Sequence, residues 1–244
     1  MLRFVYTIII NFFRILYYAP KMAHYAKHPE KYSAEKRYAV AQRLIKIIQR
    51  TGRITTEHYG VENLPKSGGY IMFANHQGRY DALGIIAGHK APCAFLVKKS
   101  RANQFLAKQF FDMMEGVSID NDSIKDQMRA LKELAARVSG GKAFIVFPEG
   151  IYEKNQGNRL LEFKQGCFLA AMKAKCPIVP VVLIDSYKVY GINSLKPVKS
   201  KVIYCEPIEY ESYKDMHSKE LSEMVKGIIA SEIKKRTAND SAEA

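Results

Sequence analysis

The sequence predicts an α/β fold with a mixed central sheet flanked by helices, preceded by an N-terminal two-helix motif. Two observations carry this prediction. From about Ile54 onward, short apolar runs bounded by turn residues alternate with longer amphipathic stretches, as in α/β proteins. Before Ile54 there are two helical stretches, the first mostly apolar and the second amphipathic with a basic face.

The segment Leu2–Ala19 is almost continuously apolar, but polar residues recur in it at intervals of four, four and three. On a helix they form one stripe, and apolar side chains cover the rest of the surface; the polar residues are Arg3, Thr7, Asn11 and Arg14. An arginine is costly at the centre of a bilayer but not at its interface, and no small-residue cleavage site follows. We therefore expect a helix that lies in one leaflet, with a membrane span as the alternative.

A second helix is predicted from Ser33, a suitable N-cap, to Arg50. Its apolar residues recur at helical spacing (Tyr38, Ala41, Leu44, Ile45 and Ile48), and its opposite face is basic (Lys36, Arg43 and Arg50, with Arg37 and Lys46 beside them). Residues 1–56 hold eleven Lys or Arg against two Glu. These residues fit either a helical pair packed on the core or, as we predict, a two-helix membrane anchor over residues 1–53 that holds anionic lipid headgroups.

The remaining chain reads as one domain over residues 54–236, followed by a disordered tail at 237–244. The runs predicted as strands are β-rich and too short for helices: Tyr70–Asn75, Cys93–Val97, Gly116–Ile119, Ala143–Phe147, Ile178–Leu183 and Lys201–Tyr204. Amphipathic helices are expected over Ile124–Val138, Phe163–Lys175 and Ser218–Arg236.

Composition limits the class of protein. The chain has 244 residues, 48% hydrophobic, and a net charge of +14, enough to form a core and to attract anionic partners. No nucleic-acid-binding motif accompanies the charge, so we expect no nucleic-acid partner. The four cysteines form no C-x-x-C pair or His/Cys cluster, so neither a metal site nor a disulfide framework is expected, and a reducing cytosolic environment fits best.

The first predicted strand of the domain ends in Asn75-His76-Gln77-Gly78-Arg79-Tyr80-Asp81. His76 and Asp81 lie five residues apart across a strand-to-helix turn, so the chain can bring the carboxylate to the imidazole. A neutral histidine oriented by an anionic partner is a general base near pH 7 and can take a proton from an alcohol. From this spacing alone, a surface histidine beside an aspartate that caps the next helix is the competing interpretation.

A second loop follows the buried strand that ends in Phe147-Pro148-Glu149-Gly150. Proline removes a backbone donor and glycine permits a tight turn, so Glu149 is presented at the end of a strand. By itself, a glutamate in such a loop is more often structural.

Together, N-H-Q-G-R-Y-D and F-P-E-G resemble the glycerolipid acyltransferase family, which includes the 1-acylglycerol-3-phosphate acyltransferases and carries H-x-x-x-x-D followed by F-P-E-G. Three further segments are similar to elements of that family: Phe95–Lys98, Phe163–Gly166 and Ile178–Val181. The resemblance runs from about Gly60 to Ile208, and an amphipathic N-terminal anchor is also known in the family.

The resemblance implies transfer of an acyl group from a thioester, acyl-CoA or acyl carrier protein, to a lipid hydroxyl, without cofactor or metal. His76 would act as the base and Asp81 would orient it. The residues expected to bind substrate are Asn75, Gly78, Arg79, Lys98, Phe147, Pro148, Glu149, Gly150 and Lys164. Backbone N–H groups near Gly78 or Gly150, or Lys98, are candidates to hold the oxyanion. Glu149 is expected to position the acceptor or the loops.

Two positions depart from the family pattern. Many members have arginine where this chain has Asn121 and Tyr152, and those arginines are expected to hold the acceptor's phosphate. Either another basic residue replaces them, from among Arg79, Lys98, Lys154, Arg159 and Lys164, or the acceptor is not lysophosphatidic acid.

The sequence therefore predicts an acyltransferase at the cytoplasmic face of the cell membrane, peripheral or monotopic, most readily acting on 1-acylglycerol-3-phosphate. The alternatives are a different lysolipid, glycolipid or amino-lipid acceptor, a non-catalytic lipid-binding protein, and a soluble thioesterase.

Overall fold

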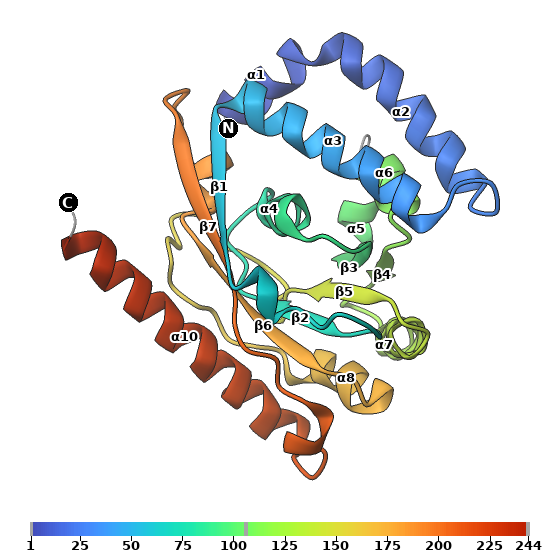
Figure 1. The fold of residues 1–244 in the computed structure, drawn as a ribbon, viewed down its shortest axis with the longest axis vertical. Coiled ribbons are helices and arrows are strands. Elements are labelled where there is room, and N and C mark those ends of the chain that lie inside the picture. Colours follow the sequence, from blue (N-terminus) through green and yellow to red (C-terminus); the bar gives the residue numbers. More distant parts are fainter. Residues whose placement is uncertain (1, 105–106, 243–244) are drawn as a thin grey trace.

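In the computed structural model, which describes residues 2–104 and 107–242, a central sheet lies between two groups of helices (Figure 1). Within these residues the sheet has seven strands, in the order β1-β7-β6-β2-β5-β3-β4. The strands are β1 (Ile54–Tyr59), β2 (Ile71–Ala74), β3 (Cys93–Lys98), β4 (Val117–Ile119), β5 (Ala143–Val146), β6 (Ile178–Ile184) and β7 (Val198–Tyr204).

The sheet is mixed, as the sequence predicts. Strand β2 pairs in parallel with both β5 and β6, and β3 pairs in parallel with β5 and β4. Strand β7 is antiparallel to β6 and parallel to β1. The carboxyl ends of β2, β3, β4, β5 and β6 therefore meet at one edge, where open α/β sheets bind their ligands.

Helices cover both faces of the sheet. They are α1 (Leu2–Ile10), α2 (Phe12–Lys27), α3 (Ala34–Gly52), α4 (Asp81–Gly88), α5 (Lys99–Ala102), α6 (Ala107–Met113), α7 (Ile124–Ser139), α8 (Leu169–Ala174), α9 (Tyr187–Gly191) and α10 (Ser218–Ala242). One core cluster joins the sheet to α7, α8 and α10, and the other joins it to α2, α3, α4 and α6 (Figure 1).

Helix α3 is built as its sequence predicts, with one exception. The Ser33 hydroxyl accepts a hydrogen bond from the backbone N–H of Lys36, and Tyr38, Ala41 and Ile45 are buried in the core. Arg37, expected on the basic face, is buried instead: it pairs with Glu115 at 2.7 Å and donates to two backbone carbonyls. The helical spacing of apolar residues does not predict the burial of Arg37, because its partner Glu115 is distant in sequence.

The first predicted helix, Leu2–Ala19, is in fact two helices bent by 79° at Asn11. The Asn11 amide donates to the Thr7 carbonyl and to the Thr51 hydroxyl of α3, each at 2.8 Å, and thereby ties the bend to α3. Beyond the bend, α2 continues through Pro20 to Lys27. Among the described residues, no single helix is long and apolar enough to cross a bilayer; the bent pair α1–α2 passes that test only as a unit, by length and composition.

Helix α1 has its polar side inward. Arg3, Thr7 and Asn11 are buried, and the Arg3 guanidinium donates to the carbonyls of Lys188, Val189 and Lys196. Apart from Arg14, the exposed residues of α1 and the start of α2 are apolar: Leu2, Val5, Ile9, Ile10, Phe12, Phe13, Leu16 and Tyr17. Three of the four residues of the polar stripe expected from the sequence therefore face the protein, and the fourth, Arg14, lies beyond the bend and is exposed.

Two ends of the domain differ from the prediction. Strand β1 is absent from the predicted set because its sequence, ITTEHY, lacks an apolar run; it is an edge strand, and polar residues protect such edges. At the other end, α10 continues past Arg236 to Ala242, so residues 237–242 are helical and not disordered. Residues 243–244 of the predicted tail lie outside the described residues.

Candidate active site

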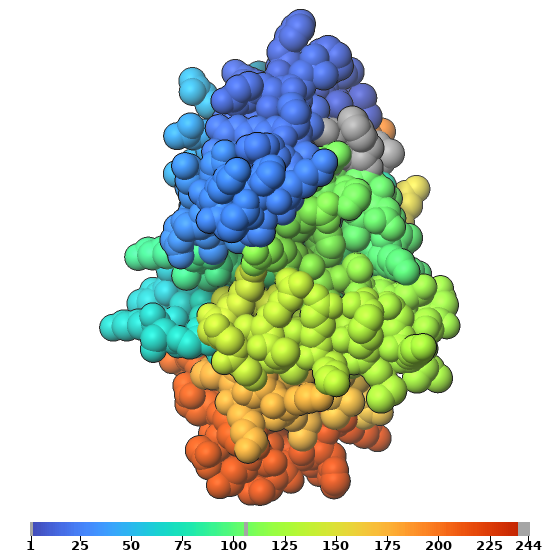
Figure 2. Space-filling view, turned by 90° about the vertical axis from the view of Figure 1, so that its right-hand side faces the viewer, coloured from blue at the N-terminus to red at the C-terminus, as the bar shows by residue number. Residues whose placement is uncertain are grey.

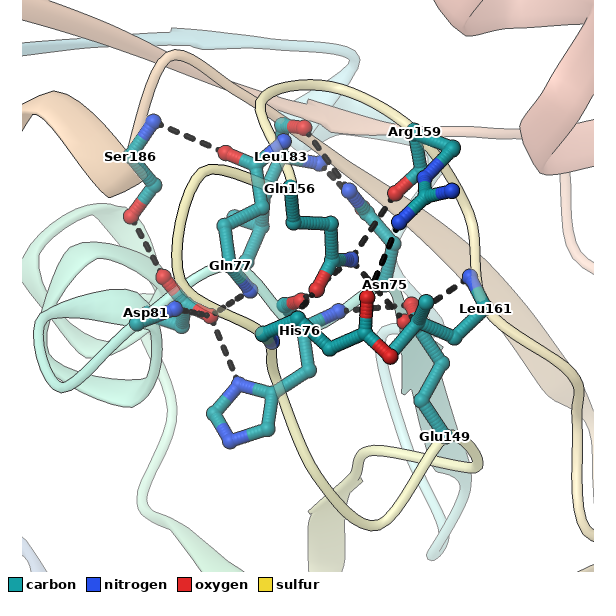
Figure 3. A network of polar contacts seen from close by, with 12 residues as sticks. Asn75, His76, Gln77, Asp81, Glu149, Gln156, Arg159, Leu161, Leu183 and Ser186 are labelled. Carbon is teal, nitrogen blue, oxygen red and sulfur yellow. Dashed lines mark hydrogen bonds and ion pairs between the residues drawn. The ribbon is translucent and has the colours of Figure 1, made fainter.

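The loops that follow three neighbouring strands, β6, β2 and β5, meet at the carboxyl edge of the sheet. Asn75 and His76 follow β2, the segment from Phe147 to Gly150 follows β5, and Ser186 lies two residues after β6. The strand pairing brings together residues that are far apart in the chain, such as His76 and Ser186, which are separated by 110 positions. Figure 3 shows their side chains in one polar network.

His76 and Asp81 form the centre of this network. The imidazole Nδ1 lies 2.7 Å from Asp81 Oδ2, the Asp81 side chain is fully buried, and the His76 side chain is 19% exposed. Asp81 is the first residue of α4, so the turn between β2 and α4 folds the carboxylate back onto the imidazole. The spacing of five residues thus produces the contact that the sequence predicts.

Asp81 is surrounded by donors. Oδ2 also accepts from the backbone N–H groups of Gln77 (2.5 Å) and Gly78 (2.8 Å), and Oδ1 accepts from the Ser186 hydroxyl at 2.5 Å. A carboxylate in this setting acts only as an acceptor, so His76 Nδ1 carries the proton. In neutral His76 the other ring nitrogen, Nε2, is then the basic atom, and it points away from the network (Figure 3).

Two aromatic rings fix the plane of the His76 imidazole. Phe147 stacks on it with ring centroids 4.3 Å apart, and Tyr152 meets it edge-on at 4.7 Å. Phe147, expected to contact substrate, therefore touches the His76 imidazole itself. Tyr152, at a position where arginine was expected for phosphate binding, brings an aromatic ring and no positive charge to the site.

Glu149 fastens the loops around His76. Its Oε1 accepts from the backbone N–H of His76 at 2.9 Å, and its Oε2 accepts from the backbone N–H of Leu161 and the side chain of Gln156, each at 3.1 Å. Only 2% of the residue is exposed, and burial raises the pKa of its carboxyl group above the ordinary value, while the three hydrogen bonds oppose that shift. These contacts fit the predicted role in positioning loops and leave Glu149 no contact surface for substrate.

Asn75 is likewise structural. It is fully buried, and its amide exchanges two hydrogen bonds with the backbone of Leu183, at 2.7 and 2.9 Å. The predicted contact between Asn75 and substrate is therefore wrong, because both polar atoms of its side chain are occupied in joining β2 to β6.

Gln77 and Asn158 extend the same link to the loop after β5. The Gln77 amide accepts from the backbone N–H of Ser186 and donates to Asn158, which in turn holds the backbone of Asp185. Asp185 has a φ of +62°, a backbone conformation that residues other than glycine rarely adopt. The network holds this strained turn and places Ser186 against Asp81.

The backbone candidates for the oxyanion are already hydrogen bonded. The N–H of Gly78 donates to Asp81, and the N–H of Gly150 closes a turn onto the Phe147 carbonyl at 3.0 Å. Gly150 has the positive φ, +69°, that its turn requires. The N–H groups of Gly78 and Gly150 themselves are therefore occupied, and the prediction that turn N–H groups near them hold an oxyanion stays a prediction for their neighbours.

Of the basic residues expected to bind substrate, one lies beside the F-P-E-G turn and two lie elsewhere. Lys164 lies beside Gly150, and its backbone N–H donates to the Pro148 carbonyl at 2.9 Å. Arg79 turns toward α1, with its guanidinium 5.3 Å from the centre of the Phe4 ring, and Lys98 is exposed at the end of β3. Of these residues, only Lys164 is in contact with the F-P-E-G turn in the part of the chain that the structure describes.

The other possible substitutes for the two missing arginines are also distributed. Arg159 pairs with Glu153 at 2.9 Å, and Lys154 is exposed. Asn121 follows β4, at the edge of the sheet and three strands from β2, and its carbonyl accepts from Gln127.

Ser186, Gln77 and Gln156 are site residues that sequence reasoning missed. Ser186 carries one usable signal, since it lies two residues past an apolar strand whose neighbours also end in polar loops. Gln156 lies in a polar loop without periodicity and has no such signal. Among the described residues, no group of three or more His, Cys, Asp or Glu side chains is arranged to hold a metal ion.

Comparison with known sequences places this arrangement in context. The chain matches the family model described as Acyltransferase over residues 55–184. It is 27% identical to a 1-acyl-sn-glycerol-3-phosphate acyltransferase of Helicobacter pylori, over 57% of this chain and 60% of that protein. It is 29% identical to the alpha enzyme of that name from Homo sapiens, over 55% of this chain and 47% of that protein. The chain thus spans about half the length of the curated relatives that it matches.

A solved structure shares the fold. The 1-acyl-sn-glycerophosphate acyltransferase PlsC of Thermotoga maritima superposes with a TM-score of 0.80, covering 97% of this chain and 95% of that one, at 23% sequence identity. At that identity the likeness concerns the fold, including the N-terminal helices that precede the sheet.

Proposed function

Because the chain belongs to the acyltransferase family, we propose that it is an O-acyltransferase that uses His76 as its base to acylate the hydroxyl of a lysophospholipid. The observation that carries the proposal is the 2.7 Å contact between His76 Nδ1 and a fully buried Asp81, with Nε2 directed away from the network. The names of the relatives support 1-acylglycerol-3-phosphate as the acceptor and phosphatidic acid as the product.

The reaction follows from the position of Nε2. The acceptor hydroxyl gives its proton to His76 Nε2 as its oxygen attacks the thioester carbonyl carbon. The tetrahedral intermediate collapses, the carbon–sulfur bond breaks, and the thiol leaves with the proton that His76 returns. An ester is formed, a thiol is released, and no acyl-enzyme intermediate is required.

Asp81 supports the charge that His76 carries during this step. A fixed anion beside Nδ1 holds the productive tautomer and stabilises the imidazolium, as in Ser-His-Asp enzymes with the substrate supplying the nucleophile. The two backbone N–H groups and the Ser186 hydroxyl keep the carboxylate in place. Phe147 and Tyr152 keep the imidazole from rotating out of this position.

The acyl donor in this proposal is acyl-CoA or acyl carrier protein, and no cofactor is needed because a thioester is already activated. Both donors are anionic, which suits a chain with a net charge of +14. Lys164, exposed beside the F-P-E-G turn, is the basic residue best placed to meet a phosphate near the reacting groups.

We also propose that the protein works at the cytoplasmic surface of a membrane. Apart from Arg14, the exposed side of α1 and the start of α2 is apolar, with Ile9 68% and Phe13 83% exposed, while Arg3 and Thr7 of α1 face the protein. Figure 2 shows the N-terminal segment as a continuous cap at one end of the molecule. Docking this cap in one leaflet spares the enzyme the cost of moving an acyl chain into water, about 0.8 kcal/mol per methylene.

The experiment that tests the proposal is transfer of labelled acyl groups from acyl-CoA and from acyl carrier protein to a panel of lysolipids in vesicles. We expect a product on 1-acylglycerol-3-phosphate. Transfer only to an acceptor without a phosphomonoester would show that Tyr152 and Asn121 mark a change of acceptor, and fatty acid release alone would indicate a thioesterase. No product from any donor and acceptor would support a lipid-binding protein on this fold.

A further inference from the structure

A basic groove lies between α1, the start of α2 and the end of α3. Its volume is about 490 Å³, and its lining includes Tyr6, Ile10, Arg14, Ile47, Arg50 and Arg53. None of its lining residues belongs to the network around His76. The groove is therefore a site separate from the candidate active site.

The groove carries three guanidinium groups and no carboxylate among its described lining residues. Arg14 is held by Asn11, whose side-chain oxygen accepts from Arg14 Nη1 at 2.8 Å. Arg50 and Arg53 lie in the last turn of α3 and just after it. The negative end of that helix amounts to about half a charge, which three guanidinium groups exceed several-fold.

Some arginines elsewhere in the described chain, Arg37, Arg129 and Arg137 among them, are paired with carboxylates, whereas Arg43 and Arg101 are not. Arg14, Arg50 and Arg53 are exposed, and no ion pair involves them within the described residues. Guanidinium groups bind phosphate oxygens in a bidentate manner, so an unneutralised set of three favours a phosphate-bearing ligand.

The apolar side of α1 identifies the source of that phosphate. Ile10 lines the groove and is 51% exposed; it follows the exposed Ile9 directly, and Asn11 alone separates it from the exposed Phe12 and Phe13. A phospholipid has the same arrangement, with a phosphate directly above its acyl chains. If the apolar side of α1 and α2 enters one leaflet, the groove stands at the level of the headgroups.

We propose that this groove binds the phosphate of an anionic membrane phospholipid and directs the protein to negatively charged membranes. This inference takes its ligand from the membrane docking proposed above, and it adds a second lipid site that is distinct from the acceptor site at His76.

The test uses the full chain and vesicles of phosphatidylcholine with and without phosphatidylglycerol. The variant Arg14→Gln/Arg50→Gln/Arg53→Gln removes the three positive charges that line the groove. The matched control, Lys27→Gln/Arg43→Gln/Lys46→Gln, removes the same three charges from exposed positions on α2 and α3 outside the groove. Circular dichroism and thermal unfolding show that each variant is folded.

We expect the groove variant to bind phosphatidylglycerol vesicles roughly 100-fold more weakly than the wild type, and the control less than about 10-fold more weakly. Binding to phosphatidylcholine alone should be the same in all three proteins. Equal losses in the two variants would overturn the proposal in favour of diffuse attraction, as would a wild type indifferent to phosphatidylglycerol.

Acyl transfer to an acceptor dispersed in detergent separates this inference from the proposed function. The groove variant should transfer acyl groups there at the wild-type rate, because the groove residues do not touch the His76 network. A rate that falls in detergent to the same degree as vesicle binding falls would place the groove in the acceptor site and overturn the assignment of a second lipid site.

Discussion

The Ser186 hydroxyl donates a 2.5 Å hydrogen bond to Asp81 Oδ1, the carboxylate oxygen on the side away from His76. Asp81 is thereby held at both oxygens, by the turn before α4 and by the loop after β6. The orientation of the imidazole consequently depends on a residue 110 positions further along the chain. In the proposed mechanism, Ser186 is therefore a positioning residue for His76.

Replacing Ser186 by alanine should lower kcat about 10-fold with little change in KM. A hydrogen bond to a charged group contributes about 1.5–3 kcal/mol, and about 1.4 kcal/mol corresponds to a factor of ten in rate. Steady-state kinetics of acyl transfer measure the effect, and Ser186→Thr, which keeps the hydroxyl, should restore much of kcat. The control is Ser222→Ala, since the buried Ser222 hydroxyl has no hydrogen-bond partner among the described residues. Equal kinetics in S186A and S222A would contradict the positioning role.

Replacing Glu149 by glutamine should destabilise the protein and slow acyl transfer. The carboxylate accepts from three donors, whereas an amide has one oxygen and presents N–H groups to a donor. We expect the free energy of unfolding to fall by about 1–3 kcal/mol, measured by urea denaturation.

The control for Glu149 is Glu153→Gln, on the same loop. Glu153 makes an exposed ion pair with Arg159, and such pairs contribute no more than about 1 kcal/mol. If E149Q were as stable and as active as E153Q, Glu149 would not be the residue that fastens the loops.

Placing aspartates on the apolar side of the N-terminal helices, as Ile9→Asp/Phe13→Asp, should release the protein from vesicles. Both side chains are well exposed, so the fold has no need of them, whereas burying charge in the acyl region of a bilayer is costly. Co-sedimentation with vesicles measures the loss. The matched control is Ile124→Asp/Met128→Asp, which changes two exposed apolar residues on α7. Equal loss of binding in both variants would argue against docking through α1 and α2.

Buried His89 should make the protein lose stability in mild acid. Burial lowers the pKa of His89 from 6.5 to about 4, and its ring is hydrogen bonded to Tyr70 and to the Ala91 carbonyl. Below pH 6.5, His89 binds a proton in the unfolded chain, whereas in the folded chain it binds one only when the pH falls to about 4. Acid therefore favours unfolding. The free energy of unfolding should fall by up to about 1.4 kcal/mol per pH unit across this window.

Urea denaturation between pH 7 and pH 4 measures this slope. His89→Gln should flatten it, while His24→Gln, at an exposed position, should not. Titration of His89 in the wild type by NMR gives an independent reading, and a midpoint near 6.5 would contradict the prediction.

Features of the fold and of the site that depend on residues close together in the sequence could be predicted, and features that depend on residues far apart could not. The strands β2, β5 and β6 are local apolar runs, and the contact between His76 and Asp81 crosses a single turn, so both follow from neighbouring residues. The bend at Asn11 and the burial of Arg37 depend on partners in α3 and beside α6, which no local pattern contains. Ser186 and Gln156 join the site through strand pairing and loop packing. Only Ser186, which lies just past an apolar strand, has a signal in the sequence, and Gln156 could not be found before the topology was known.

The N–H groups of Gly78 and Gly150, expected as oxyanion donors, also show that a sequence does not predict contacts set by the fold. Gly78 and Gly150 are correctly placed in tight turns by their sequence, but the direction of an N–H group depends on which acceptor the fold offers it. Here the acceptors are Asp81 and the Phe147 carbonyl.

The most direct test of the account compares acyl transfer by the wild type and His76→Ala, with both proteins shown to be folded by circular dichroism. His76 is part-exposed, and its side chain contacts Asp81, Phe147 and Tyr152, so the alanine variant should keep its fold. We expect transfer from acyl-CoA or acyl carrier protein to a lysophospholipid to fall at least about 100-fold, the lower bound for loss of a general base. Transfer by His76→Ala at a rate close to that of the wild type would contradict it.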